Sequence, residues 1–115
     1  PILLLDEPVS ALDLAHQWQV MHVARRLADE GRIVIVVLHD LALAAQWADR
    51  IAILHQRKIH SLGAPNDTIT DKTLEQVWGV RARVRVCEQG RPFVLVDSIA
   101  PQPGPLSEQR QDDTR

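Results

Sequence analysis

The sequence predicts an α/β fold in which helices flank a parallel sheet, and three observations carry this prediction. The apolar run Ile2–Leu5 is followed by two carboxylates and Pro8, as is typical of a buried strand that ends there. Residues 14–30 repeat apolar side chains at helical spacing, and a second apolar run, Ile33–Leu38, follows. A strand, a helix and a strand in this order nearly always cross over right-handed, with the strands parallel. Since both runs are apolar throughout, we expect both strands to be covered on both faces.

The predicted helix over residues 14–30 carries signals at both of its ends. Asp13 is a residue type that suits an N-cap, and Gly31 suits the position just after the C-terminus. Trp18 and Met21 belong to the apolar stripe of this helix. We therefore expect both side chains in the core.

Shorter elements are expected in the following part of the chain. Asp40 suits the cap of a short helix, Gly63-Ala64-Pro65 breaks the chain, and Gly79 suits the end of a later helix. The segments with helical or strand patterns are, in chain order, helix 41–48, strand 50–55, strand 58–62 and helix 72–78.

The last patterned segments predict a C-terminal β-hairpin. Residues 80–86 alternate apolar side chains with three arginines, which indicates one half-buried face and one charged face. We interpret the arginine face as a solvated edge that charge protects, rather than as an anion site. Residues 92–96 pair back after a turn. Residues 97–115, which are polar and proline-rich from Pro101 onward, are expected to form a disordered tail.

Composition limits the class of protein. The chain has 115 residues, 45% of them hydrophobic and 24% charged, with a net charge of −2, which is typical of one globular domain without a nucleic-acid-binding surface. The single Cys87 cannot form an intrachain disulfide, and no apolar run approaches the roughly 20 residues of a membrane span. The chain begins with Pro1, inside an apolar strand, so we expect it to be a piece of a longer protein whose sheet is incomplete here.

Three candidate site residues follow the two apolar strands. Asp6 and Glu7 come at the end of the first run, and His39 comes directly after the second. Because parallel strands end at the same rim of a sheet, where open α/β sheets bind ligands, we expect these side chains to lie close together. A carboxylate there can hold Mg²⁺ on a nucleotide, and its neighbour can orient or deprotonate a water molecule. For the two acids taken alone, a solvated strand end is the alternative.

The motifs around these residues resemble those of a known family. The run from Asp6 through Glu7-Pro8-Val9-Ser10-Ala11-Leu12 to Asp13 resembles the Walker B and D-loop run of ABC-type ATPases, which have a P-loop NTPase-like fold. His39, after its apolar strand, matches the switch histidine of that family. The resemblance covers residues 1–96 and implies the C-terminal catalytic half of a nucleotide-binding domain.

The resemblance implies a role in ATP hydrolysis for each matching residue. Asp6 would hold Mg²⁺ through water, Glu7 would act on the attacking water as general base, and His39 would contact the γ-phosphate of ATP. The interface with a second ATPase subunit of a homodimer would contain Ser10, Ala11 and Asp13.

Softer motifs are similar to those of one branch of these ATPases, the importers of heme and ferric siderophores. The segment Asp13-Leu14-Ala15-His16-Gln17 and the hairpin turn Gly90-Arg91-Pro92 look most like the hemin importers. This branch implies transmembrane permease subunits as partners, a periplasmic substrate-binding protein that acts indirectly, and a peripheral place on the cytoplasmic face of the inner membrane. A ferric-siderophore or vitamin B12 importer is the alternative.

Several motifs of the family do not occur in this sequence. There is no Gly-x-x-x-x-Gly-Lys-Ser/Thr loop to cradle phosphates, no glutamine loop and no Leu-Ser-Gly-Gly signature. We therefore expect this chain alone to be inactive as an ATPase. The head of a chromosome-maintenance or DNA-repair ATPase is a second alternative, although no coiled-coil heptads are present. A truncated, non-catalytic remnant or regulatory module is a third, which the upstream coding sequence would distinguish.

Overall fold

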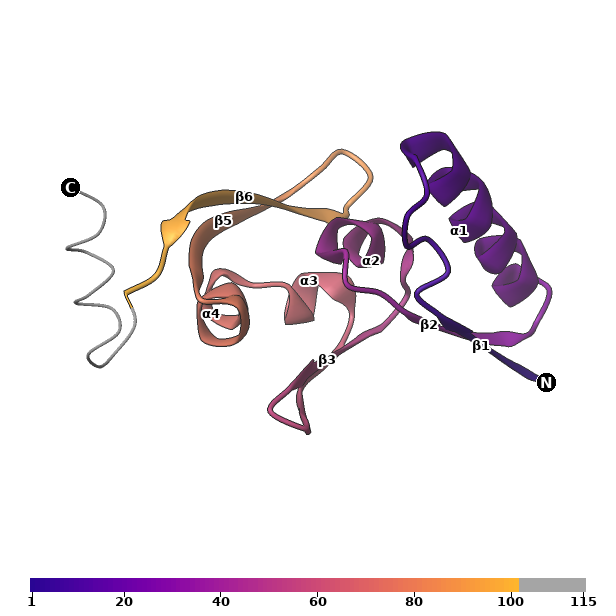
Figure 1. Ribbon diagram of the computed structural model, residues 1–115, viewed down its shortest axis with the longest axis horizontal. Coiled ribbons are helices and arrows are strands. Elements are labelled where there is room, and N and C mark those ends of the chain that lie inside the picture. The colour runs from indigo at the N-terminus through magenta and orange to yellow at the C-terminus, as the bar shows by residue number, and fades with distance from the viewer. Residues whose placement is uncertain (102–115) are drawn as a thin grey trace. The chain divides into compact units, whose positions relative to one another are not determined.

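The computed structural model describes residues 1–101, so most of the expected tail, residues 102–115, lies outside the described residues. The chain divides into two compact units, an N-terminal unit over Pro1–Ala48 and a C-terminal unit that begins at Asp49. Figure 1 labels most of the elements of both units. Each unit has its own buried residues and is described separately.

The N-terminal unit is a strand–helix–strand unit followed by a short helix. Its elements are β1 (Ile2–Asp6), α1 (Leu14–Asp29), β2 (Ile33–Val37) and α2 (Leu41–Trp47). Strands β1 and β2 pair in parallel, with Ile2 opposite Ile33 and Asp6 opposite Val37. The expected parallel pair is therefore present, and its register sets the positions of the two strand ends.

Helix α1 begins and ends where the sequence signals predict. The carboxylate of Asp13 accepts a hydrogen bond from the backbone N–H of His16 (2.9 Å), so Asp13 is the N-cap. Gly31 follows the last turn with φ of 100°, a conformation that glycine adopts without the clash that a Cβ would bring. Its N–H donates to the carbonyl of Ala28 (3.0 Å).

The core of the N-terminal unit is a small cluster shared by α1, α2 and the loop after β1. Val9, Met21 and Leu43 are its buried members. Leu12, Val20, Leu38 and Trp47 pack against them while keeping part of their surface exposed. The guanidinium of Arg25 donates to the carbonyl of Trp47 (3.3 Å), which also joins α1 to α2.

Met21 lies in this core as expected, but the prediction for Trp18 is wrong. The side chain of Trp18 keeps half of its surface exposed (50%). Its ring stacks on His22, with ring centroids 4.7 Å apart, and meets Trp47 edge-on at 5.8 Å. A large indole can cover neighbouring rings with one face and leave the other to solvent, so membership of the apolar stripe did not require full burial.

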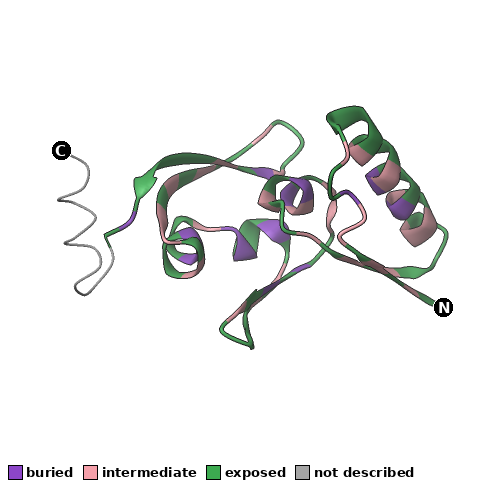
Figure 2. Ribbon diagram, viewed as in Figure 1, coloured by how far each residue is buried: buried purple, intermediate pink, exposed green. Residues whose placement is uncertain are grey.

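The expectation that β1 and β2 are covered on both faces is also wrong for this chain. Exposed and half-buried residues alternate along both strands, which Figure 2 colours by burial. Since alternate side chains point to opposite faces, only one face is covered. The exposed face carries Ile2, Leu4, Ile33, Ile35 and Val37, each between 44% and 69% exposed. No element among residues 1–48 covers this face, which we call the open face of the β1–β2 pair.

The C-terminal unit contains two antiparallel hairpins joined by short helical turns. The first hairpin pairs β3 (Ile51–His55) with β4 (Lys58–Gly63), and its two turn residues, Gln56 and Arg57, both have positive φ. Helix α3 (Pro65–Thr68) follows, and then α4 (Asp71–Thr73), which continues into a π-helical turn over Leu74–Trp78. The helix expected over 72–78 is thus divided between α4 and this turn, and it ends at Gly79 with φ of 68°.

The second hairpin pairs β5 (Val80–Val86) with β6 (Pro92–Ile99). Strand β6 runs three residues beyond the expected end at residue 96, because a bulge between Arg81 and Ala82 lets the pairing continue to Val80 opposite Ile99. The N–H of Ala100 donates to the carbonyl of Gly79 (2.9 Å) and closes the ribbon.

The charged face of β5 makes an ion pair within the hairpin. The guanidinium of Arg83 donates to both carboxylate oxygens of Asp97, at 3.1 and 3.0 Å. Both side chains are about half exposed, so the pair adds little stability but satisfies charge along this edge. This pairing agrees with the interpretation of the arginine face as a solvated strand face.

The open face of the β1–β2 pair predicts that residues 1–115 self-associate when expressed alone. A flat apolar face on a short sheet with an unpaired edge favours pairing with other copies. We expect gel filtration at micromolar concentration to show oligomers or aggregates. Replacing Ile33 and Ile35 together by Thr should shift the chain toward the monomer, because Thr keeps the β-branched shape and removes apolar surface.

The matched control replaces Val34 and Val36, on the covered face of β2, by Thr. That variant should unfold at lower temperature without losing self-association, since its open face is unchanged. A monodisperse wild-type monomer in the same column would contradict this account of the open face.

Candidate functional site

The end of β1 presents two carboxylates to solvent at the rim of the strand pair. Asp6 is the last residue of the strand and is exposed. Glu7 turns away from the strand with φ of 50°, while its N–H still donates to the carbonyl of Val37 in β2 (2.9 Å). A non-glycine residue at such a φ costs roughly 1–3 kcal/mol and persists only where its surroundings hold it. The backbone bond to β2 is one contact that holds Glu7 at this turn.

The end of β2 brings His39 to the same rim. Leu38 packs against the core on one side of it, and on the other side Asp40 caps α2. The Asp40 carboxylate accepts from the N–H groups of Ala42 (2.9 Å) and Leu43 (3.3 Å). The histidine side chain is exposed (87%). The contacts of its two neighbours hold the backbone on either side of it.

Glu7 and His39 meet across the rim. The Nε2 atom of His39 contacts the Oε1 atom of Glu7, whose side chain is 36% exposed. The two residues are 32 positions apart, and the parallel register of β1 and β2 brings them together. The expected proximity of His39 to the first strand end is confirmed by this contact.

The loop between Glu7 and α1 holds the remaining candidate residues. Ser10, Ala11 and Asp13 are exposed, whereas Val9 between them and the strand is buried. Ala11 has φ of 66°, the second positive φ in this loop. Backbone bonds close two tight turns, from Ser10 N–H to the Glu7 carbonyl (3.3 Å) and from Leu12 N–H to the Val9 carbonyl (3.1 Å).

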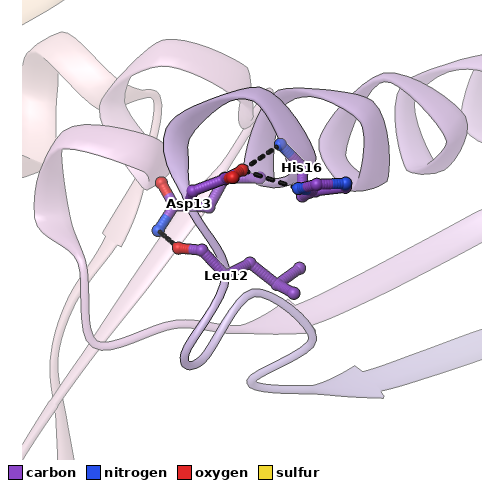
Figure 3. A network of polar contacts seen from close by, with 4 residues as sticks. Leu12, Asp13 and His16 are labelled. Atoms are coloured by element: carbon purple, nitrogen blue, oxygen red, sulfur yellow. Dashed lines mark hydrogen bonds and ion pairs between the residues drawn. The ribbon is translucent and has the colours of Figure 1, made fainter.

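Asp13 ends this loop and begins α1 (Figure 3). The pKa of Asp13 is lowered from the ordinary value of 3.8. The larger cause is the hydrogen bond from the His16 backbone, and the smaller is the contact of the Asp13 carboxylate with the His16 ring (2.7 Å). A lowered carboxyl pKa stabilises the folded state at pH above the ordinary value. That stabilisation is lost as pH falls through the lowered pKa, so the cap is intact at neutral pH.

One residue of this region was not predicted from the sequence. The side-chain amide of Gln17, in the second turn of α1, donates to the carbonyl of Leu12 (3.0 Å). The sequence held a weak signal for it, since Gln17 lies four residues after the cap on a helix that begins beside the loop. A polar residue at that spacing is common on solvated helices, so the spacing alone did not identify the contact.

The residues present fit a magnesium-assisted site only in part. Asp6 offers an exposed carboxylate at a strand end, a hard oxygen ligand of the kind that Mg²⁺ prefers. Across residues 1–101, no three His, Cys, Asp or Glu side chains converge to hold a metal ion by themselves. Further ligands would have to come from a nucleotide, water or other residues. In the same stretch of chain, no helix has the length and apolar character needed to cross a membrane.

Comparison with curated proteins gives several matches that agree with one another, whereas no family model matches the chain. The hemin import ATP-binding protein HmuV of Vibrio cholerae is 56% identical over 96 residues, which are 83% of this chain and 37% of that protein. HmuV of Rhodopseudomonas palustris (strain BisB18) is 45% identical over 104 residues, which are 88% of this chain and 39% of that protein.

A solved structure supports the fold. A metal-chelate type ABC transporter in an inward-facing conformation superposes with a TM-score of 0.67, at 23% identity, over 85% of this chain and 39% of that one. The chain spans about two fifths of the length of these relatives. The predicted resemblance to the C-terminal part of ABC transporter ATP-binding subunits, and among them to hemin import proteins, is confirmed.

Proposed function

We propose that this chain is the C-terminal part of the ATP-hydrolysing subunit of an ABC importer for hemin. It would contribute the catalytic residues from the Walker B motif onward. The observation that supports this proposal is the contact between His39 Nε2 and Glu7 Oε1 at the common end of β1 and β2. A general base and a phosphate-binding side chain must act on the same phosphoryl group, and a contact between Glu7 and His39 supports these two roles for them. The similarity to hemin import ATP-binding proteins supports the substrate.

Glu7 would act on the attacking water. Its carboxylate lies at the rim, is partly exposed, and projects from a backbone held by the bond to Val37. From there the carboxylate can accept a proton from water as the water approaches the γ-phosphate of ATP. Since phosphoryl transfer depends mainly on positioning and charge, a fixed backbone at Glu7 contributes directly to rate.

His39 would donate a hydrogen bond from Nε2 to the γ-phosphate. The side chain is exposed and touches the base, so a phosphate placed at this rim would lie within reach of both residues. The bond would become stronger as negative charge shifts in the transition state, which is how a single donor accelerates such reactions. His39 would therefore contribute more to turnover than to binding.

Asp6 would hold Mg²⁺ through a bound water. The metal would neutralise charge on the β- and γ-phosphates when nucleotide is bound. Because the sequence has no phosphate-cradling glycine loop, we infer that residues 1–115 alone neither bind ATP tightly nor hydrolyse it.

The loop residues Ser10, Ala11 and Asp13 would face a second copy of the ATPase subunit. They are exposed, and the loop that carries them has a defined backbone conformation. The complete subunit would then work as a homodimer beneath transmembrane permease subunits, on the cytoplasmic face of the inner membrane, with a periplasmic binding protein delivering hemin.

Replacing Glu7 by Gln in the complete subunit should lower the kcat of ATP hydrolysis by at least about a hundredfold, because an amide cannot accept the proton of the attacking water. ATP affinity should change little, since Glu7 acts on water. Phosphate release and equilibrium ATP binding measure the two effects. The matched control is Glu30→Gln, an exposed position at the end of α1, which should leave turnover unchanged. Near wild-type turnover in Glu7→Gln would rule out the general-base role.

Replacing His39 by Ala should lower kcat on the order of a hundredfold, with a smaller effect on ATP affinity, because one transition-state donor is lost. Steady-state kinetics over a range of ATP concentrations separates kcat from KM. His22→Ala, an exposed histidine on α1, is the matched control. Parallel losses of affinity and rate would show that His39 binds the ground state equally well, contrary to the proposal.

A further inference from the structure

The loop from Glu7 to Asp13 holds its shape against two unfavourable backbone conformations. Glu7 and Ala11 have φ of 50° and 66°, in the left-handed region that disfavours residues with a Cβ. Such conformations persist only where the surrounding structure holds them, and they concentrate at functional sites. The contacts that fix this loop therefore decide where the Glu7 carboxylate lies.

Successive backbone bonds link the two ends of the loop. Leu12 N–H donates to the Val9 carbonyl (3.1 Å), and Ser10 N–H donates to the Glu7 carbonyl (3.3 Å). These turns share Val9 and Ser10, so the two bonds join Leu12 to Glu7 in one continuous folded segment. Val9 is buried in the core and acts as the fixed point between them.

Gln17 connects α1 to this series of bonds. Its Nε2 atom donates to the Leu12 carbonyl at 3.0 Å, in a part-buried position five residues away along the chain. The Asp13 carboxylate, by contrast, accepts from the His16 backbone and contacts the His16 ring, as Figure 3 shows, so it fixes the start of the helix. Gln17 reaches past the cap into the loop itself.

We propose that Gln17 is a positioning residue for Glu7, which holds the loop by its bond to the Leu12 carbonyl and so fixes the backbone from which the carboxylate projects. Gln17 does not contact Glu7 and takes no part in proton transfer. This inference rests on the proposed catalytic function of Glu7. It assigns a role to Gln17, a residue to which the proposed function gives none.

The test compares three substitutions of glutamine on the same helix of the complete subunit. Gln17→Met keeps the length of the side chain and removes the donor, whereas Gln19→Met makes the same change at an exposed position of α1. Gln17→Lys restores a donor of similar reach. Amide hydrogen exchange at Ser10 and Leu12 reports on the loop independently of activity, and kcat and KM for ATP report on catalysis.

We expect Gln17→Met to lower exchange protection at Ser10 and Leu12 by about threefold to tenfold, the loss typical of one hydrogen bond. The kcat should fall by a similar factor with KM unchanged, because the base is misplaced while ATP contacts remain. Gln17→Lys should recover most of both, and Gln19→Met should match the wild type.

Unchanged protection in Gln17→Met would overturn the proposal, and so would lost protection with an unchanged kcat. A fall in kcat with a parallel rise in KM that Lys does not rescue would indicate general destabilisation and would also overturn it. If Gln17→Met does not fold, Gln17→Lys decides alone. A folded Lys variant that keeps the exchange protection and kcat of the wild type supports the proposal, and one that loses either overturns it. If the wild type and Glu7→Gln show the same ATPase rate, the proposed function is wrong, and exchange alone then shows whether Gln17 holds the loop.

Discussion

The parallel register of β1 and β2 is the constraint on which the candidate site depends. Asp6 lies opposite Val37, and Glu7 adds a further backbone bond to the Val37 carbonyl at 2.9 Å. A slip of one residue would exchange the covered and open faces of a strand and move Glu7 along the rim away from His39. Backbone hydrogen bonds therefore set the contact between two side chains that are far apart in sequence.

The rest of the N-terminal unit holds the exposed His39 and the partly exposed Glu7 on fixed backbones. His39 stands between Leu38, which packs against the core, and Asp40, which caps α2. Glu7 stands between a paired strand and a loop anchored by buried Val9. Side chains held in this way keep their position while remaining accessible to solvent, as the proposed roles of Glu7 and His39 require.

Local signals in the sequence were sufficient for the elements of the N-terminal unit and for its two strand ends. The Asp13 cap, Gly31 and the two apolar runs each act within a few residues. The parallel direction of the strands in a strand–helix–strand unit then placed His39 on the same rim as Asp6 and Glu7, before any contact was known. The exposure of Trp18 and the open face of β1–β2 depend on what packs against them, which the pattern of one segment does not contain. The positive φ angles of Glu7 and Ala11 could not be predicted, because neither position is a glycine. The contact of Gln17 with Leu12 depends on the folded shape of the loop, which the sequence pattern does not contain.

Glu7 and His39 are proposed to act on one phosphoryl group, and a double-mutant cycle on ATP turnover tests this most directly. The kcat of the complete subunit would be measured for the wild type, Glu7→Asp, His39→Gln and the double variant, substitutions mild enough to leave a measurable rate. If the two residues share one site, their effects should not be independent. The kcat of the double variant should then exceed, by more than about threefold, the kcat expected from multiplying the two single effects. Losses that simply multiply would show that Glu7 and His39 act independently and would contradict the account.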